Sequence, residues 1–156
     1  MEFSKKESYA IQIGNYLKNG RYAKALELST EMTGKFPKEP LSHFMAAKSY
    51  YFSGKYEKAK MEGRKAFNLS HTKSDMMFSA IITASALFML GKYDEAHKLL
   101  VHFEGENNED VEKLLLIFYA VKGDGGKAGE YYKELYSLNM DIARKFIRKL
   151  AGISEA

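Results

Sequence analysis

Few side chains in this sequence could carry out chemistry, and they do not converge. The histidines are His43, His71, His97 and His102, and there is no cysteine. His97 and His102 lie five residues apart, so on a helix they would point to different faces and form a poor metal-binding pair. The lack of cysteine excludes disulfides, thiol nucleophiles and cysteine-ligated zinc or iron–sulfur sites. These side chains therefore predict no catalytic residue and no metal site.

Two further patterns are more simply accounted for by structure than by a functional site. The run Gly123-Asp124-Gly125-Gly126 is rich in glycine, but it lacks the lysine–serine ending and the preceding strand of a phosphate-binding loop. Acidic residues are common, but none falls within an apolar run of the sequence, where a raised pKa could serve general acid catalysis. We predict that the chain is not an enzyme and uses no cofactor.

The feature that organises the chain is a phrase that recurs four times, a glycine-containing turn followed by an alanine-centred helix. The turn glycines are Gly20, Gly54, Gly91 and Gly123, which lie 34, 37 and 32 residues apart. An alanine follows each glycine by five residues, at Ala25, Ala59, Ala96 and Ala128. A period of this size predicts a solenoid of helix pairs, in which one pair cannot bury its apolar face without a neighbour.

Apolar residues recur at steps of three and four on both sides of each turn, which predicts a helix A before it and a helix B after it. Pro37 ends the first pair, because proline cannot continue a helix, and Asn107 to Asp110 suit the start of a later one. We predict an all-α fold in one domain, residues 1–156. About four helix pairs cover residues 6–39, 40–75, 76–108 and 109–138, and a last helix covers 140–151.

The repeat resembles the tetratricopeptide repeat (TPR) family, whose marks are a 34-residue unit, small and aromatic residues in helix A, an early alanine in helix B and a final proline. The matching residues of the first three units are Tyr9, Tyr16, Gly20, Tyr22, Ala25, Pro37, Ala47, Tyr50, Gly54, Tyr56, Ala59, Ala66, Ala84, Leu87, Gly91, Tyr93 and Ala96. No unit carries the family's tryptophan. The resemblance, over roughly residues 6–138, implies a right-handed α–α superhelix (a TPR-like solenoid) with a C-terminal capping helix.

In this family the A helices line a concave surface that binds peptides, so groove positions can be counted back from each turn glycine. The residues expected there are Leu41, Phe44, Lys48, Tyr51, Phe52, Phe78, Ile81, Phe88, Met89 and Ile117. This set is mostly apolar, and a large exposed apolar patch usually marks an interface. We predict a protein-interaction module, an adaptor or chaperone-like protein, that binds an apolar or amphipathic protein segment.

The same apolar surface could be covered in two ways that involve no foreign partner. The last helix, with Ile142, Phe146, Ile147 and Leu150 on one side, could fold back and cover it. Alternatively, the surface could pair with a second copy of the chain, which would make the protein a homo-oligomeric scaffold.

Another well-known use of the family is a clamp of lysine, asparagine and arginine that holds the carboxylates of chaperone tails. At the corresponding positions this chain has Ala10, Gly14, Met45, Phe78 and Ile82. None of these side chains can pair with a carboxylate. We therefore predict that the chain does not recognise such tails.

The net charge is +4 and the sequence pI is near 9.0, with basic residues concentrated in residues 55–73 and in the last helix. A basic face can bind nucleic acid, but such a face is more commonly just a solvated helix surface, so a nucleic-acid partner is the weaker alternative. The N-terminus lacks an apolar leader, and the longest uncharged stretch, residues 76–91, is too short and polar to span a bilayer. We expect a soluble, cytoplasmic protein.

Overall fold

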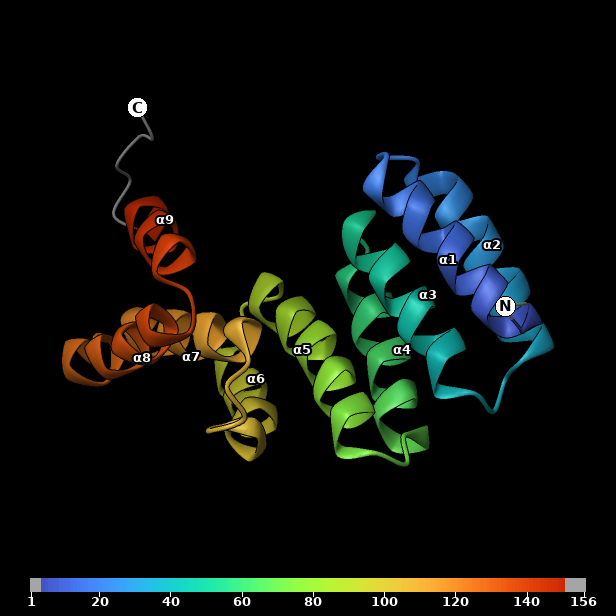
Figure 1. The fold of residues 1–156 in the computed structure, drawn as a ribbon. Coiled ribbons are helices and arrows are strands. Elements are labelled where there is room, and N and C mark those ends of the chain that lie inside the picture. The colour runs from blue at the N-terminus through green and yellow to red at the C-terminus, as the bar shows by residue number, and fades with distance from the viewer. Residues whose placement is uncertain (1–3, 151–156) are drawn as a thin grey trace. The chain divides into compact units, whose positions relative to one another are not determined.

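The structure, a computed structural model, describes residues 4–150, apart from the side chains of residues 147, 149 and 150. Within that range the chain forms helices and no strand, as the all-α prediction requires (Figure 1). The helices are α1 (Lys5–Lys18), α2 (Tyr22–Lys35), α3 (Pro40–Phe52), α4 (Tyr56–Leu69), α5 (Lys73–Met89), α6 (Tyr93–Leu100), α7 (Glu109–Val121), α8 (Gly125–Leu138) and α9 (Met140–Leu150).

All four predicted turns share one backbone geometry. Their glycines have φ values between 74° and 78°, in the left-handed region where a Cβ atom would clash. In each turn the residue after the glycine donates its N–H to a carbonyl four residues before the glycine, as from Arg21 to Tyr16 at 2.8 Å and from Lys92 to Leu87 at 2.8 Å. This bond satisfies the last free carbonyls of the helix. Each glycine therefore ends an A helix and directs the chain into the next helix.

Other helix ends follow local chemistry. α2 ends at Lys35, just before Pro37, and α3 begins with Pro40 in its first position. The Asn108 side chain starts α7 by accepting from the backbone N–H groups of Asp110 and Val111 at 2.9 and 3.2 Å. α6 stops at Leu100, and a 3-10 turn, Val101–Phe103, follows it.

The last helix, predicted over residues 140–151, is α9, and residue 151 lies outside the described residues. Its described neighbour is α8, against which it packs. Whether it also covers the predicted groove stays a prediction.

The chain divides into two compact units, an N-terminal unit (Met1–Lys92) and a C-terminal unit (Tyr93–Ala156). The boundary falls between α5 and α6, inside the predicted third repeat, so the single-domain organisation stays a prediction. In the N-terminal unit each helix packs against the next along the chain, and the A helices α1, α3 and α5 also contact one another in sequence. In the C-terminal unit α7 packs against α6 and α8.

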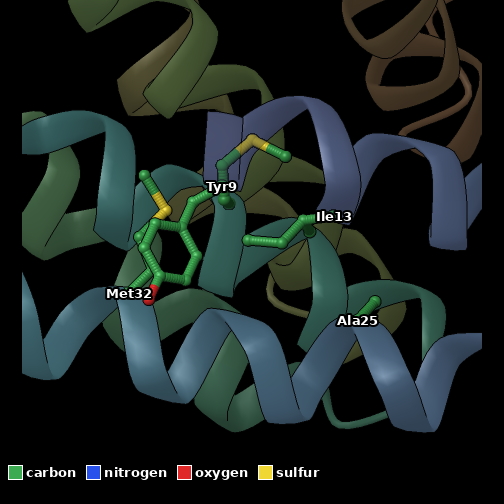
Figure 2. Packing of buried hydrophobic residues seen from close by; sticks show 5 residues of the cluster. Tyr9, Ile13, Ala25 and Met32 are labelled. Carbon is green, nitrogen blue, oxygen red and sulfur yellow. The ribbon is translucent and has the colours of Figure 1, made fainter. Parts of the chain in front are cut away.

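The core of the first repeat shows how the pairs hold together (Figure 2). Tyr9 and Ile13 of α1 meet Ala25 and Met32 of α2, and Met45 of α3 joins them. The repeat alanines at positions 25, 59 and 96 are fully buried, whereas the one at position 128 is half-buried. The sequence predicts a close crossing of helices at all four alanines. The first three are buried as that crossing requires, and the fourth is only partly buried.

Candidate functional site

Three predicted groove residues of the N-terminal unit surround one pocket. Leu41 and Phe44 of α3 and Phe78 of α5 line a hollow of about 350 Å³, together with residues at the start of α1. Phe78 is 47% exposed, although it is a large apolar side chain. We call this hollow the groove pocket. Its volume is in the range of small binding sites and suits one or two large apolar side chains.

Local structure holds the α3 side of the groove pocket in place. His43, one residue before Phe44, is buried. Its Nε2 atom donates to the carbonyl of Pro37 at 2.7 Å, and its Nδ1 atom pairs with Glu62 Oε2 of α4 at 2.6 Å. The ring therefore fixes the first turn of α3 to both the preceding loop and the following helix.

The rim of the groove pocket is polar and mostly acidic. The lining residues here are Lys6, Glu7, Glu39, Asp75 and Ser79. Lys6 Nζ forms an ion pair of 3.0 Å with Glu39 Oε2, which links α1 to the loop before α3. Glu7 accepts from the backbone of Ser4 in a helix-capping arrangement. An apolar floor with a charged rim can bind an apolar side chain and select its charged neighbours.

The rim was missing from the sequence prediction, although the repeat register could have identified part of it. Glu7, Leu41 and Phe78 each lie thirteen residues before a turn glycine. They therefore share one register position, and all three line the groove pocket. The residues predicted for the groove all lie in the second, third and fourth units, so α1 was left out of the predicted set.

A second aromatic cluster lies at the other end of α3. Phe52 is 47% exposed, stacks on Tyr22 of α2 with ring centroids 6.1 Å apart, and makes an edge contact with Tyr51. Tyr51 also meets the edge of Tyr56 of α4. Burial raises the pKa of the Tyr51 phenol, so this group stays neutral at physiological pH. Tyr22 is a neighbour that the prediction did not place in the groove.

The remaining predicted residues are spread along the A helices. Lys48 holds its ammonium group 5.6 Å from the centre of the Phe44 ring, a cation–π distance. Ile81 and Phe88 of α5 are half-buried, and Met89 is exposed. Ile117 is half-buried on α7, in the C-terminal unit. Its place beside the others stays a prediction.

Two lysines of the basic stretch in residues 55–73 pair with carboxylates, and a third lies over an aromatic ring. Lys60 is buried and pairs with Glu57 at 2.8 Å, and Lys65 pairs with Glu62 at 3.2 Å. Lys58 holds its ammonium group 5.7 Å from the centre of the Tyr50 ring. These contacts fit a solvated helix face better than a phosphate-binding surface.

His97 has structural partners. It stacks on Phe118 with ring centroids 4.2 Å apart, and its Nε2 atom lies 3.0 Å from the Tyr119 hydroxyl. Burial, together with the nearby charge of Lys127, lowers the pKa of His97. Over residues 4–150, no three histidine or acidic side chains are placed to hold a metal ion. Over the same residues, no helix is both long and apolar enough to cross a bilayer.

Comparison with known proteins supports the architecture. No protein-family model matches the chain, and no curated protein does so either. Among solved structures, a mutant of MamA, a TPR-like protein, is similar with a TM-score of 0.65 over 87% of this chain and 78% of that chain. The two sequences are 18% identical, so the likeness extends to the fold alone. The chain therefore has an all-α, TPR-like helical-repeat fold.

Proposed function

We propose that this protein is a non-enzymatic interaction module that binds an apolar or amphipathic segment of another protein in the groove pocket. The observation that supports this most directly is the half-exposed Phe78 facing Leu41 and Phe44 in one hollow. When a partner removes apolar surface of this kind from water, the free energy of the complex falls by about 25 cal/mol per Å². A TPR-like fold supplies such surfaces for protein partners.

The polar rim adds specificity to this proposal. A partner side chain that enters the pocket brings its neighbours close to Glu7 and Asp75. Basic neighbours would be attracted there, and acidic ones would be repelled. The segment that fits best therefore combines a large apolar side chain with lysine or arginine close to it.

A pair of matched variants tests the groove pocket. Phe78→Gln removes an exposed, large apolar side chain from the pocket. Met61→Gln removes an apolar side chain of similar exposure, 55%, from α4 outside the pocket. We expect Phe78→Gln to weaken partner binding by about tenfold or more, because large aromatic side chains dominate such interfaces. Met61→Gln should have little effect.

The measurement is affinity purification of partners with the wild type and both variants, followed by mass spectrometry. Circular dichroism should show that all three proteins are equally folded. An identical partner set with folded Phe78→Gln would contradict the proposal. If the recovered partner is a second copy of this chain, light scattering would show concentration-dependent assembly. Self-association would then replace the binding of a foreign segment as the proposed function.

A further inference from the structure

The C-terminal unit contains a small pocket whose charged lining residues are all glutamates. They are Glu104 after the 3-10 turn, Glu112 of α7, and Glu130 and Glu134 of α8, with Tyr131 between the last two. The pocket has a volume of about 170 Å³. We call it the acidic pocket. It lies in a different unit from the groove pocket, and the proposed function makes no use of it.

Glu112 distinguishes this pocket from an ordinary group of surface carboxylates. Its residue is only 3% exposed, and its Oε2 atom has no hydrogen-bond partner. Buried polar atoms in folded proteins are almost always paired, because an unpaired one loses its bonds to water without replacement. An unpaired carboxylate oxygen lining a pocket indicates that a donor from outside the chain completes the site.

Tyr131 holds one of the other carboxylates of the pocket, that of Glu104, in place. The Tyr131 hydroxyl donates to Glu104 Oε1, and its ring stacks on Tyr119 with centroids 5.4 Å apart. Burial and this hydrogen bond raise the pKa of Tyr131, so it remains a neutral donor. Glu104 is thereby fixed at the edge of the pocket as an acceptor.

We propose that the acidic pocket binds the guanidinium group of an arginine side chain presented by a partner protein. A guanidinium carries five N–H donors in one plane and can bond to more than one carboxylate at once. It is also less strongly hydrated than an ammonium group, so it reaches a buried carboxylate at lower cost. A bare metal ion fits less well, since no three acidic side chains among the described residues are placed to hold one.

The electrostatics of Glu112 agree with this assignment. Burial, with Glu134 and Glu104 nearby, raises its pKa to about 7. A bound cation would reverse that effect, because it stabilises the charged form. Binding should therefore strengthen as the pH rises through 7 and the carboxyl group ionises.

The test uses three capped tripeptides, acetyl-Gly-Arg-Gly-amide and its lysine and citrulline counterparts, titrated into the full chain and followed by NMR. Citrulline has the shape of arginine without its charge. We expect saturable shifts of amides near Glu104, Glu112 and Glu134 with the arginine peptide, weaker binding of the lysine peptide, and none with citrulline. The Glu112 carboxyl signal should titrate at lower pH when the arginine peptide is present.

Variants complete the test. Glu112→Gln, and separately the exposed Glu134→Gln in case the first fails to fold, should weaken arginine binding by about tenfold or more. Glu27→Gln on α2, with the same change of charge, should leave it unaffected. Equal shifts with citrulline, unchanged affinity in folded Glu112→Gln, or pH-independent affinity would each overturn the proposal. Saturable shifts with calcium chloride while the arginine peptide is inert would overturn the guanidinium assignment. None of these results depends on the groove pocket.

Discussion

Glu112 shows how a single residue escapes local prediction. No acidic residue falls within an apolar run of the sequence, yet Glu112 is buried in the structure, and burial raises its pKa to about 7. Its sequence neighbours Asp110 and Lys113 form an ordinary helix-surface pair at 3.9 Å. Burial of Glu112 comes instead from the packing of α7 against α8, which no local pattern specifies.

The raised pKa predicts a particular pH dependence of stability. Glu112 ionises near pH 4.5 when unfolded and near 7 when folded, so the unfolded state loses its proton first as the pH rises. The neutral form of Glu112 therefore adds to the free energy of unfolding, and this contribution is complete below pH 4.5. It is lost as the pH rises to about 7, a change of up to about 3 kcal/mol. Glu112→Gln should lack this loss and be the more stable protein at high pH.

Urea unfolding of the wild type and Glu112→Gln across this pH range would measure the effect. Subtracting one free energy of unfolding from the other removes the contributions of the titrating groups that both proteins share. Glu27→Gln removes the same charge from an exposed position on α2 and is the matched control. A difference that does not change with pH would show that Glu112 titrates normally in the folded protein.

At the scale of elements, the crossing of α4 and α5 depends on a glycine that does not belong to a turn. A Cβ atom on Gly63 would overlap Thr83 Oγ1 and lie 3.2 Å from Thr83 Cβ. Thr83 is itself buried and bonded to the Ser79 carbonyl at 2.7 Å, so it has little room to move. The close approach of these two helices also positions Phe78 on α5, and with it the groove pocket.

Gly63→Ala should therefore destabilise the N-terminal unit by about 1–3 kcal/mol, because overpacking forces the helices apart. The matched control is Gly14→Ala in the middle of α1, where an added Cβ meets nothing within 4 Å. That change should stabilise the protein by up to about 1 kcal/mol through helix propensity. Denaturant unfolding compares the two, and equal effects would contradict the steric argument.

At the scale of the whole molecule, the chain has two compact units, and each contains its own buried residues. A stack of repeats is held together by contacts between neighbours, so it can form one domain and still open in parts. Leu135 is fully buried in α8, and Ile13 is fully buried in α1. These two positions report on one unit each.

Leu135→Ala should cost about 2–5 kcal/mol locally, because it leaves a cavity. We expect amide hydrogen exchange to accelerate in α7 and α8 while α1 to α3 keep their protection. Ile13→Ala should have the reverse pattern. Equal acceleration in every helix would instead show that residues 4–150 unfold as a single cooperative body.

The helices and turns were predictable because local chemistry specifies them. A glycine free to adopt positive φ ends each A helix, Pro37 ends the first pair, and Asn108 caps α7. The three-residue and four-residue spacing of apolar side chains then determines which face of each helix is buried. From that register the sequence also predicts Leu41, Phe44 and Phe78 for one binding surface. All three line the groove pocket, and their role in binding stays a prediction.

Tertiary structure decided the features that arise where helices meet. Two of these features join residues that are far apart in the chain: the ion pair of Lys6 with Glu39, and the close approach of Gly63 to Thr83. The third, the burial of Glu112, depends on a neighbouring helix. Such features depend on distances between side chains of different helices, and the spacing of apolar residues in the sequence does not specify those distances. The sequence by itself therefore determined a clamp-less repeat of helix pairs. Only the packed structure showed a polar rim around its groove pocket and an unpaired carboxylate in a second, acidic pocket.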